Sequence, residues 1–496
     1  MNKQTHKLWG AAFTGEPSDA VIAFTAGRDV ASVPPADEKL LPYDLWVNKA
    51  HCVMLAKTGI IPATDAGKIL SGLTELEKMV TVGKFTLDPA KEDVHTNIET
   101  WLTEKFGIDV AGKLHTARSR NDQIVTDMKL YMRDQTLLYI DHTLVLAKVL
   151  IGLSEQYKNT PFPGFTHRQH AMVTTFGHIC AGFALMIIRD IERFQHWFTL
   201  HNLSPLGNAV AYGTSFPVDK SLTAKLLGFD GPDLNSMDAI TNHWEPEADL
   251  AFDIIILMNH LSLIAETLIL LATQEFGMVK LADQCSTGSS MMPQKKNPDP
   301  LEVMKGKTGF AQGQLVSLLS MGKGNFIGYN RDSQWTKYII MDLVSECELA
   351  PIVLAGVIST MTVNTDVMVS WCHKGFIGAT TLMEQLVSEL HIPMRKAKIL
   401  VEQAIKVNSS GDVVTGQNLG VSQAQVASWQ DPATIISLTK SFGGPGVHSM
   451  KTSLKKLKKK LMSQKTWFIK KQKEKLTAET MLKTFIASLT CLKGGE

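Results

Sequence analysis

The sequence predicts an all-α fold built around a central bundle of long helices. Apolar residues recur at three- and four-residue steps over long stretches, whereas the alternation typical of strands is scarce. Five long helices are expected, at about residues 124–157, 175–200, 247–275, 299–319 and 332–360. Several of these segments are apolar on more than one face, so the helices must be buried against one another.

The 496 residues are enough for two to four domains. Boundaries are expected near residues 115–120 and 365–375. They divide the chain into an N-terminal helical domain, 1–118, a central long-helix bundle, 119–370, and a C-terminal helical domain, 371–496. Irregular connections are expected at 202–215, 228–242 and 284–300.

Composition excludes several classes of protein. The formal net charge is only +2, so the chain as a whole is not suited to polyanions. The six cysteines are far apart and form no CxxC pair, which argues against a structural zinc site and a disulfide scaffold. No apolar signal segment follows the polar N-terminus. The longest apolar stretch, 250–272, is interrupted by Asp253, Asn259, His260 and Glu266, which predicts a buried helix rather than a membrane span. A cytoplasmic protein is expected.

Residues 451–475 hold eleven lysines and one acidic residue, Glu474, and the rest of the chain carries 39 basic and 47 acidic residues. A basic tail of this kind can bind nucleic acid or an anionic membrane surface. The ordinary interpretation is the solvated face of an amphipathic helix, with Leu454, Leu457, Leu461 and Phe468 packed beneath it. The ordinary interpretation is favoured.

Three segments carry the residue types of a catalytic site. Gly288-Ser-Ser-Met-Met-Pro-Gln-Lys-Lys-Asn-Pro298 predicts a mobile loop that leads into a helix N-terminus, where free N–H groups favour anions. His115-Thr-Ala-Arg-Ser-Arg-Asn-Asp-Gln123 contains two arginines, and guanidinium groups bind carboxylates in a bidentate manner. Gly164-Phe-Thr-His-Arg-Gln-His-Ala171 places a histidine just before a long helix, where it could carry a proton. Taken singly, each also fits an ordinary surface loop, helix cap or structural histidine.

Together these strings resemble the fumarase/aspartase superfamily, and most closely the argininosuccinate lyase family with its lens relative delta-crystallin. Tyr329-Asn-Arg-Asp-Ser-Gln-Trp-Thr-Lys337 and Glu92-Asp-Val-His-Thr96 are similar to further family segments. The resemblance covers roughly residues 8 to 450. It implies a three-domain fumarase/aspartase-like fold and a homotetramer whose active sites are shared between subunits.

The resemblance implies the elimination of an amine from a succinyl-type substrate, with argininosuccinate cleaved to arginine and fumarate. Ser289 would be the base, His167 the proton donor oriented by Glu302, and Lys295 a binder of the carboxylate that takes up charge. The implied substrate-binding residues are His95, Ser119, Arg120, Asn121, Thr166, Asn297, Tyr329, Gln334 and Lys337. Neither a metal nor an organic cofactor is expected, since no ligand cluster is visible in the sequence.

The chain departs from the family pattern at several positions. Gly27 stands where the family has a substrate-binding serine, Ala11-Ala12 and Met172-Val173 replace usual residues, and Ala117 replaces a glycine. The departures at Gly27, Ala11-Ala12 and Met172-Val173 motivate an alternative, a related fumarate-releasing lyase that acts on a different N-succinyl amine. Two further alternatives are a non-catalytic structural protein and a nucleic-acid binder. The first is disfavoured because Ser289, Lys295, Asn297 and His167 are all present, and the second because the lysine-rich tail has few aromatic residues for base stacking.

Overall fold

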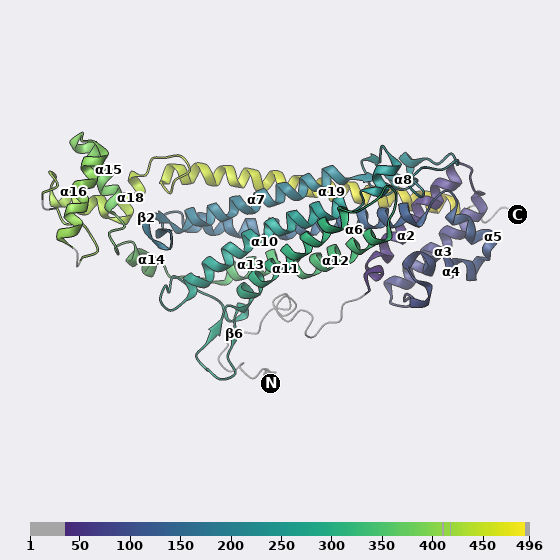
Figure 1. The fold of residues 1–496 in the computed structure, drawn as a ribbon, viewed down its shortest axis with the longest axis horizontal. Helices are drawn as coiled ribbons and strands as arrows, with labels where there is room; N and C mark the ends of the chain where they lie inside the picture. The colour runs from purple at the N-terminus through teal and green to yellow at the C-terminus, as the bar shows by residue number, and fades with distance from the viewer. Residues whose placement is uncertain (1–34, 409–410, 417, 492–496) are drawn as a thin grey trace.

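The computed structural model describes residues 35–408, 411–416 and 418–491, and it has an elongated helical architecture (Figure 1). Six helices of the described chain form the central bundle: α6 (Arg120–Gln156), α7 (Phe176–His201), α10 (Glu245–Ala272), α11 (Asp299–Gly322), α12 (Thr336–Cys347) and α13 (Ala350–Thr360). The all-α prediction is confirmed. The expected helix over 332–360 is two helices preceded by a 3-10 turn, Arg331–Trp335, and Pro351 lies in the first turn of α13.

Shorter elements lie at the two ends of the bundle. One end holds α2 (Ala36–Lys57), α3 (Ala63–Thr81), α4 (Val94–Phe106) and α5 (Ile108–Ala111), and the other holds α14 (Thr365–Trp371), α15 (Ala379–Leu390), α16 (Met394–Val407), α17 (Gln423–Gln430) and α18 (Pro432–Leu438). Two small helices, α8 (Lys220–Leu226) and α9 (Ser236–Thr241), follow α7.

Strands in the described chain are short and form two-stranded pairs. The longest pair is the antiparallel hairpin β1 (Pro161–Thr166) and β2 (Gln169–Thr175), which the sequence pattern does not reveal. The other pairs join two-residue strands: β3 (Leu203–Ser204) with β4 (Gly231–Pro232), β5 (Val279–Lys280) with β8 (Thr362–Val363), and β6 (Thr287–Gly288) with β7 (Lys296–Asn297).

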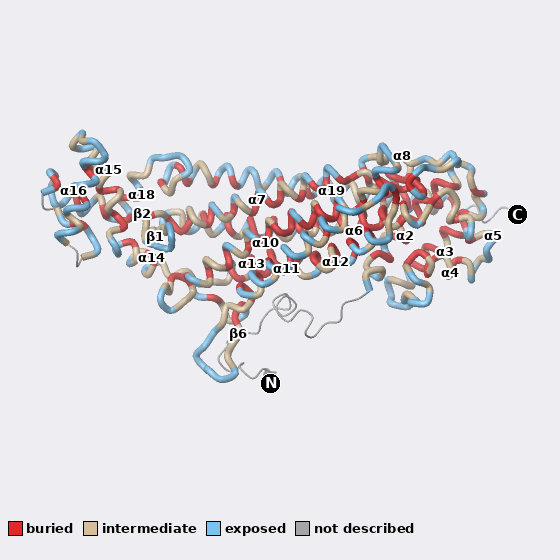
Figure 2. The backbone as a smooth tube through the Cα atoms, viewed as in Figure 1, coloured by how far each residue is buried: buried red, intermediate tan, exposed pale blue. Residues whose placement is uncertain are grey.

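The lysine-rich segment belongs to α19 (Val447–Thr490), a single helix that packs along α6, α7, α3 and α2 and so runs the length of the bundle (Figure 1). Leu454, Leu457 and Phe468 are buried and Leu461 is partly buried, while the outer side of the helix is exposed (Figure 2). The interpretation as an amphipathic helix with a solvated lysine face is therefore confirmed.

Two helices of the bundle with long apolar stretches, α6 and α10, owe their composition to burial in the core. By length and composition, α6 and α10 could each cross a membrane. However, half or more of the residues in their most apolar windows are buried inside the protein, as in the core helices of globular proteins. Figure 2 shows these buried residues along the inner sides of the bundle.

Candidate active site

The N-terminus of α6 presents the Ser119-Arg120-Asn121 segment. The Ser119 hydroxyl accepts a hydrogen bond from the Asn121 N–H, and the Ser119 N–H donates to the Asp122 carboxylate at 2.9 Å, which forms a capping box. The second carboxylate oxygen of Asp122 accepts the N–H groups of Gly207 and Ala209. The cap fixes the backbone of the segment, and Arg120 remains exposed.

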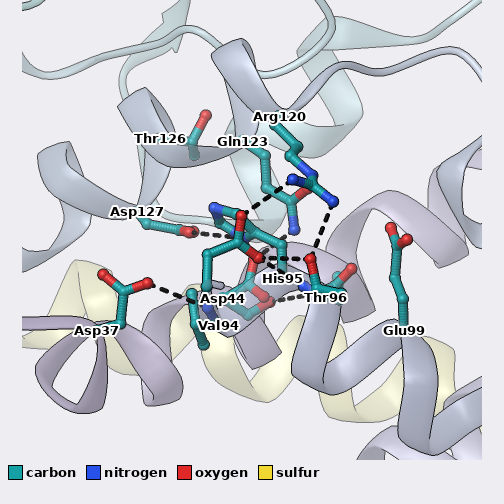
Figure 3. A network of polar contacts seen from close by, with 12 residues as sticks. Asp37, Asp44, Val94, His95, Thr96, Glu99, Arg120, Gln123, Thr126 and Asp127 are labelled. Carbon is teal, nitrogen blue, oxygen red and sulfur yellow. Dashed lines mark hydrogen bonds and ion pairs between the residues drawn. The ribbon is translucent and has the colours of Figure 1, made fainter. Parts of the chain in front are cut away.

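Arg120 is paired with the start of α4. Its guanidinium donates to the Thr96 hydroxyl at 2.9 Å and lies 3.2 Å from the carboxylate of Asp93, the N-cap residue of α4 (Figure 3). A substrate carboxylate at the α6 N-terminus would meet both this guanidinium and the free N–H groups of the first helical turn. The arrangement suits anion binding.

Beneath Arg120 and Thr96 lies a buried cluster of charged groups, in which Asp44, His95 and Gln123 point toward one another (Figure 3). The Nδ1 atom of His95 is 3.1 Å from Asp44 and 3.8 Å from Asp127, and Gln123 donates to Asp44 at 2.5 Å. Burial alone would lower the pKa of His95, but the neighbouring Asp44 carboxylate outweighs it and the pKa is raised. Burial and the Asp44 charge raise the pKa of Asp127 well above its usual range.

Sequence reasoning did not identify Asp44 and Asp127, or the role of the buried Arg118. An acidic residue within an otherwise apolar helix face was the available sign of a buried charge. Ligand atoms of Asp44, His95 and Asp127 lie within 4.8 Å of one another, a spacing that could hold a metal ion. The positive charge of Arg118, which acts on both carboxyl groups, already offsets the charge that a cation would balance.

Tyr329, Gln334 and Lys337 line one small cavity next to the first turns of α6, which contribute Ile124, Val125 and Met128. Lys337 lies 2.6 Å from Asp37, whose other carboxylate oxygen accepts the Val94 N–H. The predicted substrate-binding residues at 95, 119–121 and 329–337 therefore meet around the start of α6. His95 is only 4% exposed, so it faces the cluster beneath this surface.

The segment from 287 to 297 projects from the bundle as a loop closed by the pairing of β6 with β7 (Figure 1). The Ser289 hydroxyl oxygen accepts the backbone N–H groups of Met291 and Met292, at 3.2 and 3.0 Å. Lys295 is exposed on the loop, and Asn297 and Glu302 flank the start of α11. The expected run from loop to helix N-terminus is confirmed.

His167 lies at the tip of the β1–β2 hairpin. Thr166 pairs with Gln169, so the turn consists of His167 and Arg168, both with left-handed φ angles, 52° and 61°. Such a two-residue turn matches the twist of antiparallel strands, but it usually contains glycine or asparagine. Thr166 and His167 are exposed. Below them Phe165 and the His170 ring pack against each other, and His170 packs against Trp371 of α14.

The three predicted catalytic segments, which are the α6 N-terminus, the Ser289 loop and the His167 hairpin, lie at separate places along the molecule (Figure 1). The α6 N-terminus is next to α4, the Ser289 loop projects near the start of α11, and the His167 hairpin lies beside α14 at the opposite end of the bundle. One protomer thus gathers the predicted substrate-binding residues of 119–121 and 329–337, but it does not bring Ser289 or His167 to them. Within the described residues Glu302 makes no hydrogen bond or ion pair with His167.

Two of the departures can be placed in the structure. Ala117 has a φ of 64°, a conformation that glycine adopts without strain, which explains why alanine is the unusual residue there. In β2, Met172 is 40% exposed and Val173 is buried against Ile377, Ile435 and Ile436. Gly27 and Ala11-Ala12 lie outside the described residues.

Comparisons with known proteins place the chain in a family. A family model described as "Lyase" matches residues 28–313. Argininosuccinate lyase from Streptococcus agalactiae serotype V is 40% identical over 402 residues, 81% of this chain and 85% of that protein. The Streptococcus suis enzyme is 37% identical over 471 residues, 93% of this chain and 100% of that protein. A crystal structure of EDDS lyase in complex with formate superposes with a TM-score of 0.87 at 25% identity, and it covers 96% of this chain and 97% of that one. The chain therefore belongs to the argininosuccinate lyase family, the carbon–nitrogen lyases of the fumarase/aspartase superfamily.

Proposed function

We propose that this enzyme cleaves argininosuccinate to arginine and fumarate by β-elimination. The proposal rests on its relatives named argininosuccinate lyase, which match it over most of its length. The observation that carries it in the structure is the gathering of Ser119, Arg120 and Asn121 with Tyr329, Gln334 and Lys337 at one end of α6.

Elimination requires removal of a weakly acidic proton from the carbon next to a carboxylate, and the resulting dianion needs electrostatic stabilisation. Ser289 would take the proton. A free serine is a very weak base, but two backbone N–H groups donate to the Ser289 oxygen, and such donors stabilise an alkoxide. Lys295 and Asn297, on the same loop, would bind the carboxylate that takes up the charge. Closure of the loop over substrate would exclude water.

The remaining residues would bind substrate and pass on the second proton. Ser119, Arg120, Asn121 and Thr166 would hold the succinyl carboxylates, and Tyr329, Gln334 and Lys337 would hold the amine part. Arg120 and Lys337 are each paired with an acid, Asp93 and Asp37, which orients both side chains until a carboxylate arrives. His167, oriented by Glu302, would protonate the departing nitrogen. The proposed chemistry involves no metal or organic cofactor.

A homotetramer with shared sites accounts for the separation of the three groups. Ser289, His167 and Arg120 are presented at different places along one protomer, so other protomers would complete each site. The bundle also exposes large apolar side chains, including Phe252, Leu263 and Leu270 of α10 and Phe310, Val316 and Leu319 of α11. Exposed apolar patches of this kind mark protein interfaces.

We also propose that the enzyme is cytoplasmic and that the domains divide at residues 118 and 370.

The second candidate function is the release of fumarate from another N-succinyl amine. It is favoured by the fold-wide similarity to EDDS lyase and by the substitution of Gly27 for the serine usual in the family. Differences confined to the amine side would leave the residues proposed to bind the succinyl part unchanged.

Absorbance of fumarate during incubation with argininosuccinate tests the first candidate, and incubation of fumarate with a panel of amines tests the second. Ser289→Ala should lower turnover at least ~100-fold, a typical contribution of general base catalysis, with substrate binding retained. The adjacent exposed Ser290→Ala is the matched control and should stay close to wild type. A Ser289→Ala enzyme that keeps more than about a hundredth of the rate would remove Ser289 from the role of base.

A further inference from the structure

The cavity that holds Tyr329 and Lys337 contains two buried groups to which the proposed mechanism gives no role, His243 and Glu247. Glu247, in the first turn of α10, is 1% exposed, and His243 just before the helix is 9% exposed. The His243 ring stacks on Tyr329 with 5.3 Å between centroids, and its Nε2 atom lies 2.9 Å from the Ser333 hydroxyl. Both groups therefore form part of the wall of the amine side of the proposed site.

The hydrogen-bonding capacity of the Glu247 carboxyl is only partly used. Its Oε2 atom is buried and has no hydrogen-bond partner, while the carboxyl interacts with the Thr336 side chain. The Thr336 hydroxyl donates to the Ser333 carbonyl at 2.7 Å, so its single proton is used there. Burial raises the pKa of Glu247 to about 8 and outweighs the opposite effects of the Thr336 side chain and the Lys337 charge.

None of the described groups that line the cavity forms an ion pair with Glu247. Lys337 on α12 lies near it but is paired with Asp37 on α2 at 2.6 Å. Burial raises the pKa of Tyr329 to about 12 and lowers the pKa of His243 to about 4, so both are neutral at pH 7. The ionisable groups that line the described cavity are thus one lysine, one acid and two neutral rings.

The free space in the cavity is about 10 Å³ for the centre of a water-sized sphere, which is room for one water molecule or one ammonium group. Lys337 and Glu247 both line this space, so they offer a cation and a carboxyl for the α-carboxylate and the α-ammonium group of an amino acid. An unpaired carboxyl buried among apolar groups of α6 gains most from a ligand cation, because the pair forms where water is excluded.

We propose that Glu247 determines specificity for the amine product by receiving the α-ammonium group of arginine, with Lys337 beside it for the α-carboxylate. The inference rests on the proposed function and deepens it. On binding, the ammonium favours the carboxylate form of Glu247, and the displaced proton leaves to solvent. His243 and Tyr329 act as the neutral wall that keeps other charges from the carboxyl. If Glu247 were only a structural group of the core, its loss would affect all ligands alike.

The test is a double-mutant cycle in which one protein group, the Glu247 carboxyl, and one ligand group, the α-ammonium, are removed separately and together. Wild type and Glu247→Gln are compared in the addition direction, with fumarate and either arginine or 5-guanidinopentanoate, which lacks only the α-ammonium. Wild type should prefer arginine in kcat/KM, and Glu247→Gln should reduce that preference roughly 10- to 100-fold, the range for a charged hydrogen bond. The KM for fumarate should remain at its wild-type value, which also shows that the variant folds.

Asp253→Asn is the matched control. Asp253 is another buried carboxyl on α10, with its pKa raised by burial to about 7, but it lies beside Arg193 in a different cavity. Its variant should keep the wild-type preference for arginine. An unchanged preference in Glu247→Gln, or an equal loss for both ligands, would overturn the inference while leaving the proposed function intact. If wild type releases no fumarate from argininosuccinate, the proposed function and the inference fail together.

Discussion

At the scale of single residues, strained backbone conformations mark the surfaces to which we assign substrate binding. His167, Arg168 and Ala117 adopt left-handed backbone conformations, which cost a non-glycine residue roughly 1–2 kcal/mol each. The hairpin tolerates the cost because its strands pair on both sides of the turn and its base packs on Trp371. The hairpin therefore holds the backbone of His167 in a fixed place, with the side chain exposed.

Buried histidine at position 51 makes stability depend on pH. Its Nε2 atom donates to the Thr116 carbonyl at 2.9 Å, and burial lowers its pKa to about 3, below the unfolded value of about 6.5. Below pH 6.5 the unfolded chain binds a proton that the folded chain does not, so stability is lost as the pH falls, by up to ~1.4 kcal/mol per pH unit. Urea unfolding of wild type and His51→Asn at pH 7 and pH 5 should show a smaller loss in the variant. The exposed His448→Asn should keep the wild-type loss, and equal losses in all three proteins would contradict the assignment.

At the scale of elements, the junction between α6, the hairpin and α7 is closely packed. The Gly177 N–H donates to the Tyr157 carbonyl, and the Ser154 hydroxyl donates to the Gly177 carbonyl at 2.7 Å. A Cβ atom on Gly177 would lie 2.5 Å from the Lys158 backbone and from the Ser154 carbonyl oxygen. The close approach joins the ends of the two helices and so positions the hairpin between them.

Two glycines of α7 give a matched pair of substitutions. Gly177→Ala should lower the free energy of unfolding by ~1–3 kcal/mol, because the added methyl meets backbone that cannot move aside. Gly182→Ala should raise it by up to ~1 kcal/mol, since an added Cβ there meets nothing within 4 Å and alanine favours the helix. Urea unfolding measures both, and equal stability of the two variants would refute the packing argument.

The long helices could be predicted because their apolar periodicity extends over many turns, as in α6, α7 and α10. The break between α12 and α13 was missed because apolar residues continue across it. The β1–β2 hairpin was missed because its turn is His167-Arg168 rather than asparagine and glycine. Site residues in contiguous strings could be proposed from resemblance, whereas Asp44, Asp127, His243 and Glu247 could not, since only the packing of distant helices brings them to the site.

At the scale of the whole molecule, the proposed tetramer makes the active site a property of several chains. A mixture of Ser289→Ala and Arg120→Ala protomers, each inactive alone, should regain activity once mixed tetramers form. Random mixing leaves both wild-type side chains in about one site of four when they come from different protomers, so recovery should approach about a quarter of wild type. Fumarate release and native mass measured on the same sample test this. Mixed tetramers without recovered activity would show that one protomer supplies both groups.

The length of α19 limits how this protein can change over evolutionary time. The helix spans 44 residues, about 66 Å at ~1.5 Å per residue, and it contacts both the bundle and the N-terminal helices. Lysines on its outer side can be exchanged for other polar residues with little consequence. A single inserted or deleted residue is different, because it rotates everything beyond it by about 100° and would turn Leu482 and Leu489 toward solvent. We therefore expect related sequences to tolerate substitutions on the exposed side of this helix, but to contain no insertions or deletions within it.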